Sequence, residues 1–285
     1  PGVIDPICDQ LVDEIKHDGA ADLVKAVTFE FPTRVTAALL GLPPEDLDLF
    51  RRLSMDLIAI QFDIETGLHA SADLHDYFLE QVEQRRKTMT NDVIGDLVGA
   101  EIDSEKLTDE AIISFLRLLL PAGLETTYRS SGNLLYLLLT HPDQLDAVVA
   151  DRSLIPAAIE EGLRYETPLL ALPRTLTREV ELRGVRIPAG AVVNLCTGSA
   201  NHDETRWSDP DTFDIHRPWH AHIAFAGGIH MCLGMHLARV ETRAMLNSLF
   251  DRVSDLQLVP DENTKIVGMP FRSPNQLPVT FRPAS

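Results

Sequence analysis

The sequence predicts a mainly α-helical protein with small β-sheets, an α+β fold, and three observations support this prediction. Residues 1–167 carry apolar side chains at helical spacing in successive segments that prolines and glycines separate. From Pro168 onward, β-branched residues, alternation and turn signals replace the helical spacing. Near the end of the chain, a glycine-rich loop with one cysteine precedes a further amphipathic helical segment, residues 235–250. No low-complexity linker interrupts the sequence, so we expect residues 1–285 to form a single domain.

The composition excludes some classes of function. Lys and Arg number 25 against 43 Asp and Glu, and the net charge of −18 argues against general nucleic-acid binding. Three widely spaced cysteines suit a reducing cytoplasm better than a disulfide scaffold. The most apolar run, residues 112–124, contains Arg117 and is shorter than the ~18 residues that suggest a membrane span. We therefore expect a cytoplasmic protein with no membrane segment.

The first 167 residues are expected to be helical. The chain enters a helical pattern directly after Pro1, which predicts a fragment whose natural N-terminal part is missing. We expect Pro32 to divide the helical stretch 20–40, and Pro44 with the acids after it to open a new helix. The other expected helices are at residues 3–16, 71–87, 92–101, 108–140, 142–151 and 155–166.

The longest of these helices, residues 108–140, contains residues in its middle that disfavour a helix. Pro121 cannot donate a backbone hydrogen bond, and Gly123 lowers helix propensity further. Thr126 can donate to the carbonyl oxygen of Ala122, four residues earlier. Such local conflicts often mark functional segments. The alternative is a proline kink that a core helix tolerates.

The residues after Pro168 are expected to form short strands. Residues 169–193 predict strands and hairpins, and residues 207–218 predict an irregular connection. Residues 251–285 predict further strands, with turns at residues 260–261 and 273–275.

The glycine-rich loop at residues 225–234 holds Cys232 just before the helix at 235–250. A thiolate at the start of a helix is stabilised by free backbone N–H groups and by the helix dipole. Such a cysteine is a nucleophile, a metal ligand or a small buried hydrophobe. No CxxC pair or His/Cys cluster stands nearby, which argues against a zinc site.

The pattern F-x-x-G-x-H-x-C-L-G at residues 225–234, followed by L-A-R-V-E, resembles the haem-binding loop of the cytochrome P450 family in its soluble bacterial form. The segments A-G-L-E-T-T at 122–127 and E-G-L-R at 161–164 resemble two further motifs of that family, in the same order. The resemblance covers essentially the whole chain, except that the family's N-terminal strands and helices are absent. It implies a cytochrome P450 fold that is incomplete at its N-terminus.

The resemblance also implies a haem b cofactor (iron protoporphyrin IX) with Cys232 as the axial thiolate of the iron. Arg174 and His230 correspond to residues that contact the haem propionates. The other cofactor-binding residues that it implies are Ala122, Phe225, Gly228 and Gly234. Glu125 and Thr126 correspond to an acid–alcohol pair that delivers protons to dioxygen.

Glu161 and Arg164 lie three residues apart, on one face of a helix. Without other information this spacing indicates a surface ion pair. By the resemblance, the two residues form a buried structural pair, which a further arginine normally completes. Thr212 stands at the position of that arginine, and whether Arg217 replaces it is open.

The function that the resemblance implies is insertion of one oxygen atom of O2 into a small or medium hydrophobic substrate. The expected substrate-pocket residues are Leu124, Leu170, Ala171 and Phe271. Electrons would come from a ferredoxin or similar partner on the Cys232 side, where Arg239 and Arg243 either assist docking or are simply solvated. One alternative is a truncated, non-catalytic fragment that binds haem weakly or not at all. Another is peroxide use or isomerisation on the same haem, which the presence of Glu125 and Thr126 disfavours.

Overall fold

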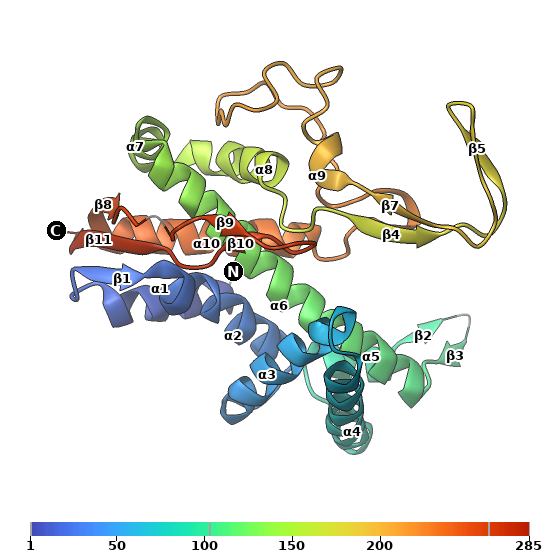
Figure 1. The fold of residues 1–285 in the computed structure, drawn as a ribbon. Coiled ribbons are helices and arrows are strands. Elements are labelled where there is room, and N and C mark those ends of the chain that lie inside the picture. The colour runs from blue at the N-terminus through green and yellow to red at the C-terminus, as the bar shows by residue number, and fades with distance from the viewer. Residues whose placement is uncertain (1, 103, 262, 285) are drawn as a thin grey trace.

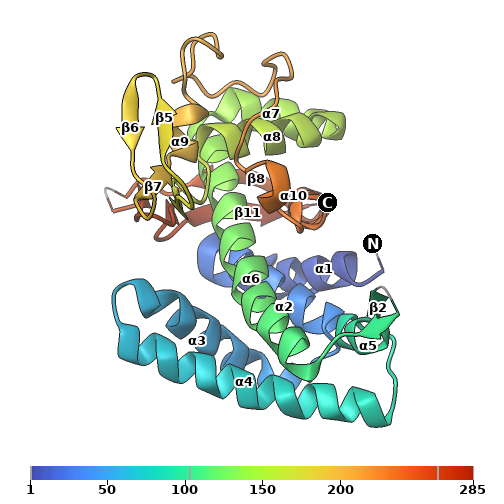
Figure 2. The same cartoon turned by 90° about the vertical axis from the view of Figure 1, so that its right-hand side faces the viewer.

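The structure is a computed structural model that describes residues 2–102, 104–261 and 263–284. Its central element is α6 (Asp109–Thr140), whose 32 residues span about 48 Å at 1.5 Å per residue. The side chain of Thr108 caps the helix by accepting a hydrogen bond from the backbone N–H of Ala111. The helix continues through Pro121, as the sequence predicts. In both views α6 runs from the layer formed by α3 and α4 to the layer formed by α7 and α8 (Figures 1 and 2).

Helices dominate the first part of the chain, as expected. The helical elements that precede α6 are α1 (Ile4–Ile15), the π-helical turn η1 (Val24–Thr28), α2 (Glu30–Leu39), the 3₁₀ turn η2 (Pro44–Asp46), α3 (Leu47–Ile58), the 3₁₀ turn η3 (Ala59–Gln61), α4 (Ile64–Lys87) and α5 (Val93–Gly99). The expected division at Pro32 is wrong, because this residue lies in the first turn of α2, where a missing N–H group costs nothing. The start of α4 is also earlier than expected, since Asp63 caps it by accepting from the backbone N–H of Thr66 at 3.1 Å.

The second part of the chain is mixed, again as expected. Its helical elements are α7 (Pro142–Ala150), the 3₁₀ turn η4 (Arg152–Leu154), α8 (Ile155–Tyr165), α9 (Thr197–Ala200), the 3₁₀ turn η5 (Gly228–His230) and α10 (Met235–Arg252). Its strands are β4 (Leu172–Thr175), β5 (Val180–Leu182), β6 (Val185–Ile187), β7 (Val192–Leu195), β8 (Val253–Leu258), β9 (Ile266–Val267), β10 (Ser273–Pro274) and β11 (Pro278–Pro283). The strands form small antiparallel pairings, and the β5–β6 hairpin projects from the body of the molecule (Figure 1).

One strand lies where the sequence predicts helix. Residues Ala20–Asp22 form β1, which pairs antiparallel with β11 and completes the sheet β1–β11–β8. The expectation of a helix from residue 20 is therefore wrong at its start, because the pairing partner lies more than 250 residues further along the chain. A two-stranded hairpin, β2 (Glu101–Ile102) with β3 (Glu105–Lys106), precedes α6.

The buried apolar residues form two cores. One core contains α1, the start of α2, the C-terminal end of α6, α7, α8, α10 and the sheet β1–β11–β8. The other contains the end of α2, α3, α4, α5 and the N-terminal half of α6. Of the helices that the structure describes, α2 and α6 alone contribute residues to both cores, and they join the two halves of the molecule. Among the described residues, no helix is long and apolar enough to cross a membrane.

A carboxyl group is buried where α10 packs in the first core. Glu241 is 2% exposed, and its Oε1 atom has no hydrogen-bond donor among the described residues. Burial raises the pKa of Glu241 to about 8, although an interaction with the hydroxyl of Thr127 opposes the increase. The folded protein therefore holds a proton on Glu241 at pH values at which the unfolded chain has released it.

We predict that replacing Glu241 by Gln flattens the pH dependence of stability. The raised pKa stabilises the fold fully below the pKa of an unfolded glutamate, and this contribution is lost as the pH rises toward 8. The variant should therefore match the wild type near pH 5 and exceed it by on the order of 3 kcal/mol at pH 8. Urea unfolding at both pH values measures the difference. The exposed Glu204→Gln variant is the control, and parallel curves for wild type and Glu241→Gln would contradict the prediction.

Candidate functional site

The loop between η5 and α10 presents Cys232 to solvent. Its backbone N–H donates to the carbonyl oxygen of Phe225 over 3.0 Å and closes the loop. Ala226 and Gly228 have φ angles of 57° and 68°, a left-handed conformation that glycine adopts freely and alanine only at a cost. Cys8 is buried whereas Cys232 is exposed, so Cys232 is not the inert core residue that an isolated cysteine often is.

An exposed face of α6 carries the second predicted motif. Leu118, Ala122 and Thr126 are spaced four residues apart, which places them on one side of the helix. Leu118 is 68% exposed, Ala122 is exposed and Thr126 is partly exposed. The Thr126 hydroxyl donates to the carbonyl oxygen of Ala122 over 2.8 Å, which confirms the bond predicted from the sequence.

The cysteine loop and the middle of α6 are neighbours. Phe225 lines a cavity of about 10 Å³ together with Ser130 and Leu134 of α6 and with Ala238 of α10. Ser130 follows Thr126 by one helical turn, so the loop lies close to the A-G-L-E-T-T segment. The structure thereby brings together two motifs that lie about a hundred residues apart in the sequence.

The residues of this region fit a haem. Among the described residues, no cluster of three or more His, Cys, Asp and Glu side chains could hold a metal ion. A Cβ atom added to Gly228 or Gly234 would meet nothing within 4 Å, which leaves open space beside the loop. The apolar side chains of Ile229 and Leu233, on either side of Cys232, are 97% and 75% exposed. A single thiolate, flanking apolar side chains and open space suit a large apolar macrocycle that carries iron.

Glu125 lies on a different side of α6 from Thr126. It is 2% exposed, and its carboxylate accepts a hydrogen bond from Arg129 Nε at 2.7 Å. Arg129 also donates to Ser273 Oγ at 3.0 Å, so it links α6 to β10. Arg129 was not among the predicted site residues, although its spacing of four residues from Glu125 on a helix could have identified it.

Three of the predicted pocket residues come together at the C-terminal hairpin. The backbone N–H of Leu170 donates to the carbonyl oxygen of Pro270 at 2.9 Å, and Leu169 forms an isolated bridge with Phe271. Leu170 and Ala171 therefore lie beside Phe271, whose ring is 5.7 Å from the Arg129 guanidinium. Leu124 is separate from this group, because it is buried in the core formed with α2 to α5.

The two predicted propionate contacts lie on different elements. Arg174, partly exposed on β4, donates to the carbonyl oxygen of its neighbour Pro173 at 2.8 Å. His230 is exposed at the end of η5. No carboxylate in the described part of the chain forms an ion pair with Arg174.

Glu161 and Arg164 are buried, so the interpretation as a surface ion pair is wrong. Arg164 is 1% exposed and holds both carboxylate oxygens of Glu161 at 2.8 Å. Its remaining N–H groups donate to the carbonyl oxygens of Asn201, Pro210 and Thr212 at 2.8–3.1 Å. All five donors of the guanidinium are thus satisfied, and α8 is fixed to the segment that follows α9.

Arg217 completes this network. Its Nε atom donates to Glu161 Oε1 at 3.2 Å, and its Nη2 atom donates to the carbonyl oxygens of Asp209 and Thr212 at 3.0 and 2.8 Å. Thr212 contributes only its backbone. The open question from the sequence is therefore answered, because Arg217 supplies the second guanidinium.

Arg239 has a different environment from the one expected for a docking residue. Its guanidinium forms a bidentate ion pair with Glu160, with Nε–Oε1 and Nη2–Oε2 distances of 2.6 and 2.8 Å. An arginine held in this way is not a solvated surface charge. Arg243 is exposed.

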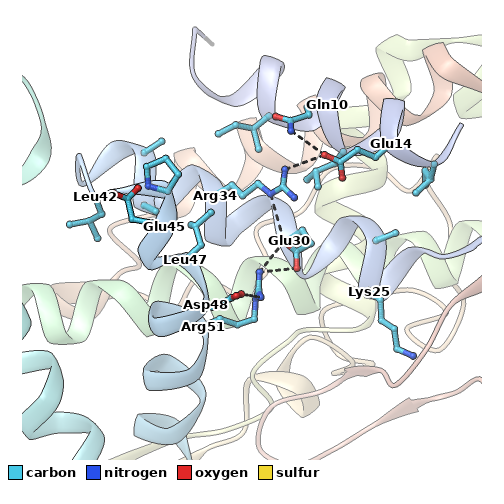
Figure 3. A pocket seen from close by; sticks show the side chains of 17 residues that line it. Gln10, Glu14, Lys25, Glu30, Arg34, Leu42, Glu45, Leu47, Asp48 and Arg51 are labelled. Atoms are coloured by element: carbon cyan, nitrogen blue, oxygen red, sulfur yellow. Dashed lines mark hydrogen bonds and ion pairs between the residues drawn. The ribbon is translucent and has the colours of Figure 1, made fainter.

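A separate groove lies away from these residues. A groove of about 770 Å³ runs between α1, α2 and α3 and contains none of the predicted site residues (Figure 3). Its charged side chains largely neutralise one another, since Arg51 pairs with Glu30 and Asp48, and Arg34 with Glu14 and Glu30. We do not assign this groove to the candidate site.

Comparisons with known proteins agree with the geometry. A family model described as "Cytochrome P450" matches residues 47–267. The Steroid C26-monooxygenase of Mycobacterium tuberculosis (strain CDC 1551 / Oshkosh) is 34% identical over 98% of this chain and 77% of its own length. The Vitamin D3 dihydroxylase of Streptomyces griseolus is 37% identical over 98% of this chain and 69% of its own length. The solved structure of cytochrome P450 CYP109Q5 from Chondromyces apiculatus has a TM-score of 0.92 and 41% identity, over 99% of this chain and 72% of that one.

We predict that the two arginines of the Glu161 network differ in their contribution to stability. Arg164→Ala removes the bidentate partner of a buried carboxylate and should cost about 3–5 kcal/mol. Arg217→Ala leaves that partner in place and should cost about 1–2 kcal/mol. Urea unfolding measures both losses, with the exposed Arg186→Gln variant as the control. Equal losses for the two alanine variants would contradict this account.

Proposed function

Because this chain belongs to the cytochrome P450 family, we propose that it is a haem-thiolate monooxygenase that inserts one oxygen atom of O2 into a small or medium hydrophobic substrate. The family places it among the oxidoreductases, and its relatives include monooxygenases. The observation that carries the proposal is Cys232, exposed in a glycine-rich loop at the start of α10 and close to α6. We propose haem b as the cofactor. The bound haem would supply the redox-active iron that activates O2.

The residues of this chain would hold the cofactor on two sides. Cys232 would bind the iron, and Phe225, Gly228 and Gly234 would form the loop beneath it. On α6, Ala122 offers a small exposed side chain that allows a flat ligand to approach closely. Arg174 and His230 would hold the propionates, since a guanidinium forms strong charge-assisted bonds with carboxylates.

Thr126 and Glu125 would deliver protons to the bound oxygen. The Thr126 hydroxyl is held by its bond to the Ala122 carbonyl, which leaves its oxygen free to accept a hydrogen bond on the exposed side of the helix. Glu125 would relay a proton, which its carboxylate first accepts and then passes on. Arg129 orients its carboxylate and compensates the charge that burial would otherwise make costly.

Apolar side chains support the proposed class of substrate. Leu170, Ala171 and Phe271 lie together at the C-terminal hairpin, next to the exposed Met269. The names of two relatives refer to a steroid and to vitamin D3. The likeness to these relatives supports a hydrophobic substrate for this chain as well.

We propose that a ferredoxin or similar protein supplies electrons on the Cys232 side. Arg243 remains a candidate docking residue, whereas the ion pair of Arg239 removes it from that role. We further propose a cytoplasmic location, on the grounds of the odd number of cysteines. A single haem-binding domain, residues 1–285, is supported by α2 and α6, which belong to both cores.

A fragment that binds haem weakly or not at all is the second candidate function. The chain spans 69–77% of the two curated relatives reported above. Haem retention separates the two candidates.

We predict that the purified chain, supplied with haem, gives the spectrum of a thiolate-bound ferrous–CO complex. Cys232→Ser should abolish the thiolate signature, because a serine hydroxyl does not replace the sulfur ligand. Cys196→Ser, which removes the other exposed cysteine, should preserve it. If the wild-type chain retained no haem, the monooxygenase proposal would fail in favour of the fragment.

We predict that Thr126→Ala uncouples electron use from product formation. Without the hydroxyl, the chain would lose the group that holds a proton donor near the bound oxygen, so electrons would be consumed without forming product. Product formed per electron consumed measures the coupling. Thr140→Ala is a control on the same helix, because the Thr140 hydroxyl likewise donates to a carbonyl four residues earlier, at 2.8 Å. An unchanged yield per electron in Thr126→Ala would refute the role in proton delivery.

A further inference from the structure

Two adjacent glutamates on α8 hold different parts of the molecule. Glu161 belongs to the network of Arg164 and Arg217. Glu160 instead binds Arg239 of α10 through two hydrogen bonds of 2.6 and 2.8 Å. Nothing in the motifs explains this second ion pair, and the reaction described above does not use it.

A histidine completes the surroundings of Glu160. His222 Nδ1 accepts a hydrogen bond from the backbone N–H of Ala224 at 3.2 Å. The ring hydrogen therefore lies on Nε2, which donates to Glu160 Oε2, also at 3.2 Å. Glu160 thus receives donors from α10 and from the segment that leads into the cysteine loop.

Arg239 connects this ion pair to the cysteine loop. Its guanidinium carbon lies 4.5 Å from the centre of the Phe225 ring, within the range of a cation–π interaction. The carbonyl oxygen of Phe225 accepts the backbone N–H of Cys232. A continuous series of contacts therefore runs from Glu160 through Arg239 and Phe225 to Cys232.

The charges in this series are firmly held. Burial by itself would raise the pKa of Glu160, but hydrogen bonds from Arg239 and His222 outweigh it and lower the pKa to about 2. The pKa of Arg239 is raised above its ordinary value, first by its hydrogen bond with Glu160, and to a smaller extent by negative charge on Cys232. Arg239 is therefore a permanent positive charge that contacts the Phe225 ring, and the backbone of Phe225 is hydrogen-bonded to Cys232.

A simpler explanation is that the pair only joins α8 to α10. The chain contains a comparison for this possibility. Arg252, at the other end of α10, pairs with Asp9 at 2.9 Å and with Asp13 at 3.2 Å, and joins α10 to α1. That pair contacts neither Phe225 nor Cys232. If both ion pairs did no more than join helices, breaking either one would have the same effect on the cysteine loop.

We propose that Glu160 and Arg239 are positioning residues for the Cys232 thiolate. Arg239 fixes the Phe225 ring and supplies positive charge on the side of the cysteine loop. Glu160 partly compensates that charge. The proposal rests on the proposed function in one respect, that Cys232 binds haem iron. Reduction of the iron adds a negative charge to the site, and a nearby positive charge favours the reduced state. The two residues should therefore affect the reduction potential in opposite directions.

The first experiment measures the reduction potential of the haem-loaded chain. Arg239→Gln should lower the potential, because a positive charge is lost, and Glu160→Gln should raise it, because Arg239 is left uncompensated. Arg239→Lys keeps the charge and should stay closer to the wild type than Arg239→Gln. Arg252→Gln is the matched control and should leave the potential unchanged. Shifts of the same sign in Glu160→Gln and Arg239→Gln would overturn the proposal, since both variants break the same ion pair.

The second experiment needs no haem. Deuterium uptake by a peptide that covers residues 225–234 reports how firmly the Cys232 amide is held in the free chain. Uptake should be faster in Arg239→Gln and Glu160→Gln than in the wild type, and unchanged in Arg252→Gln. Equal uptake in all four proteins would refute the positioning role. Absence of the thiolate signature in the wild-type chain would instead refute the proposed function, while this measurement would still decide whether Arg239 holds the loop.

Discussion

The polar middle of α6, residues 125–133, is the constraint on which the rest of the structure depends. The helix is apolar on both sides of this stretch and enters a different core at each end. Within the stretch, the buried polar side chains have partners except at Asn133 Oδ1, and a buried polar group without a partner costs about 1–3 kcal/mol. Arg129 satisfies Glu125 and reaches Ser273, and Asn133 donates to the carbonyl oxygens of Glu166 and Arg272. These bonds fix the C-terminal hairpin and the end of α8 against the same part of α6 that carries Thr126.

The two adjacent glutamates of α8 likewise fix separate segments of the chain. Successive residues of a helix point about 100° apart, so Glu160 and Glu161 reach different neighbours. Glu161 is hydrogen-bonded to Arg164 and Arg217, which hold the irregular segment after α9. Glu160 is hydrogen-bonded to Arg239 of α10. The cysteine loop lies between these two attachments in the sequence. Its shape, including the left-handed backbone of Ala226, is therefore determined by its fixed ends as well as by its own glycines.

Local features were predictable from the sequence, and long-range pairings were not. The spacing of apolar residues predicted α6 and α10, and the bond from Thr126 to Ala122 follows from a four-residue spacing on one helix. The motifs led to the family and to the α+β fold class. By contrast, β1 is three residues long and forms only because β11 lies beside it. Periodicity carries no information about the ion pair between Glu160 and Arg239, whose members lie 79 residues apart.

The two cores share α2 and α6, but each half of the molecule can open separately. Separation of α3 and α4 from α6 would expose the apolar surface of one core and leave the other core, with α8 and α10, intact. The turn between α3 and α4 already exposes Phe62 and Ile64, so its opening exposes little additional apolar surface. Opening of the α3–α4 side therefore does not require the side that carries Cys232 to change shape. Opening of the first region and rigidity of the second are thus governed by different packing contacts.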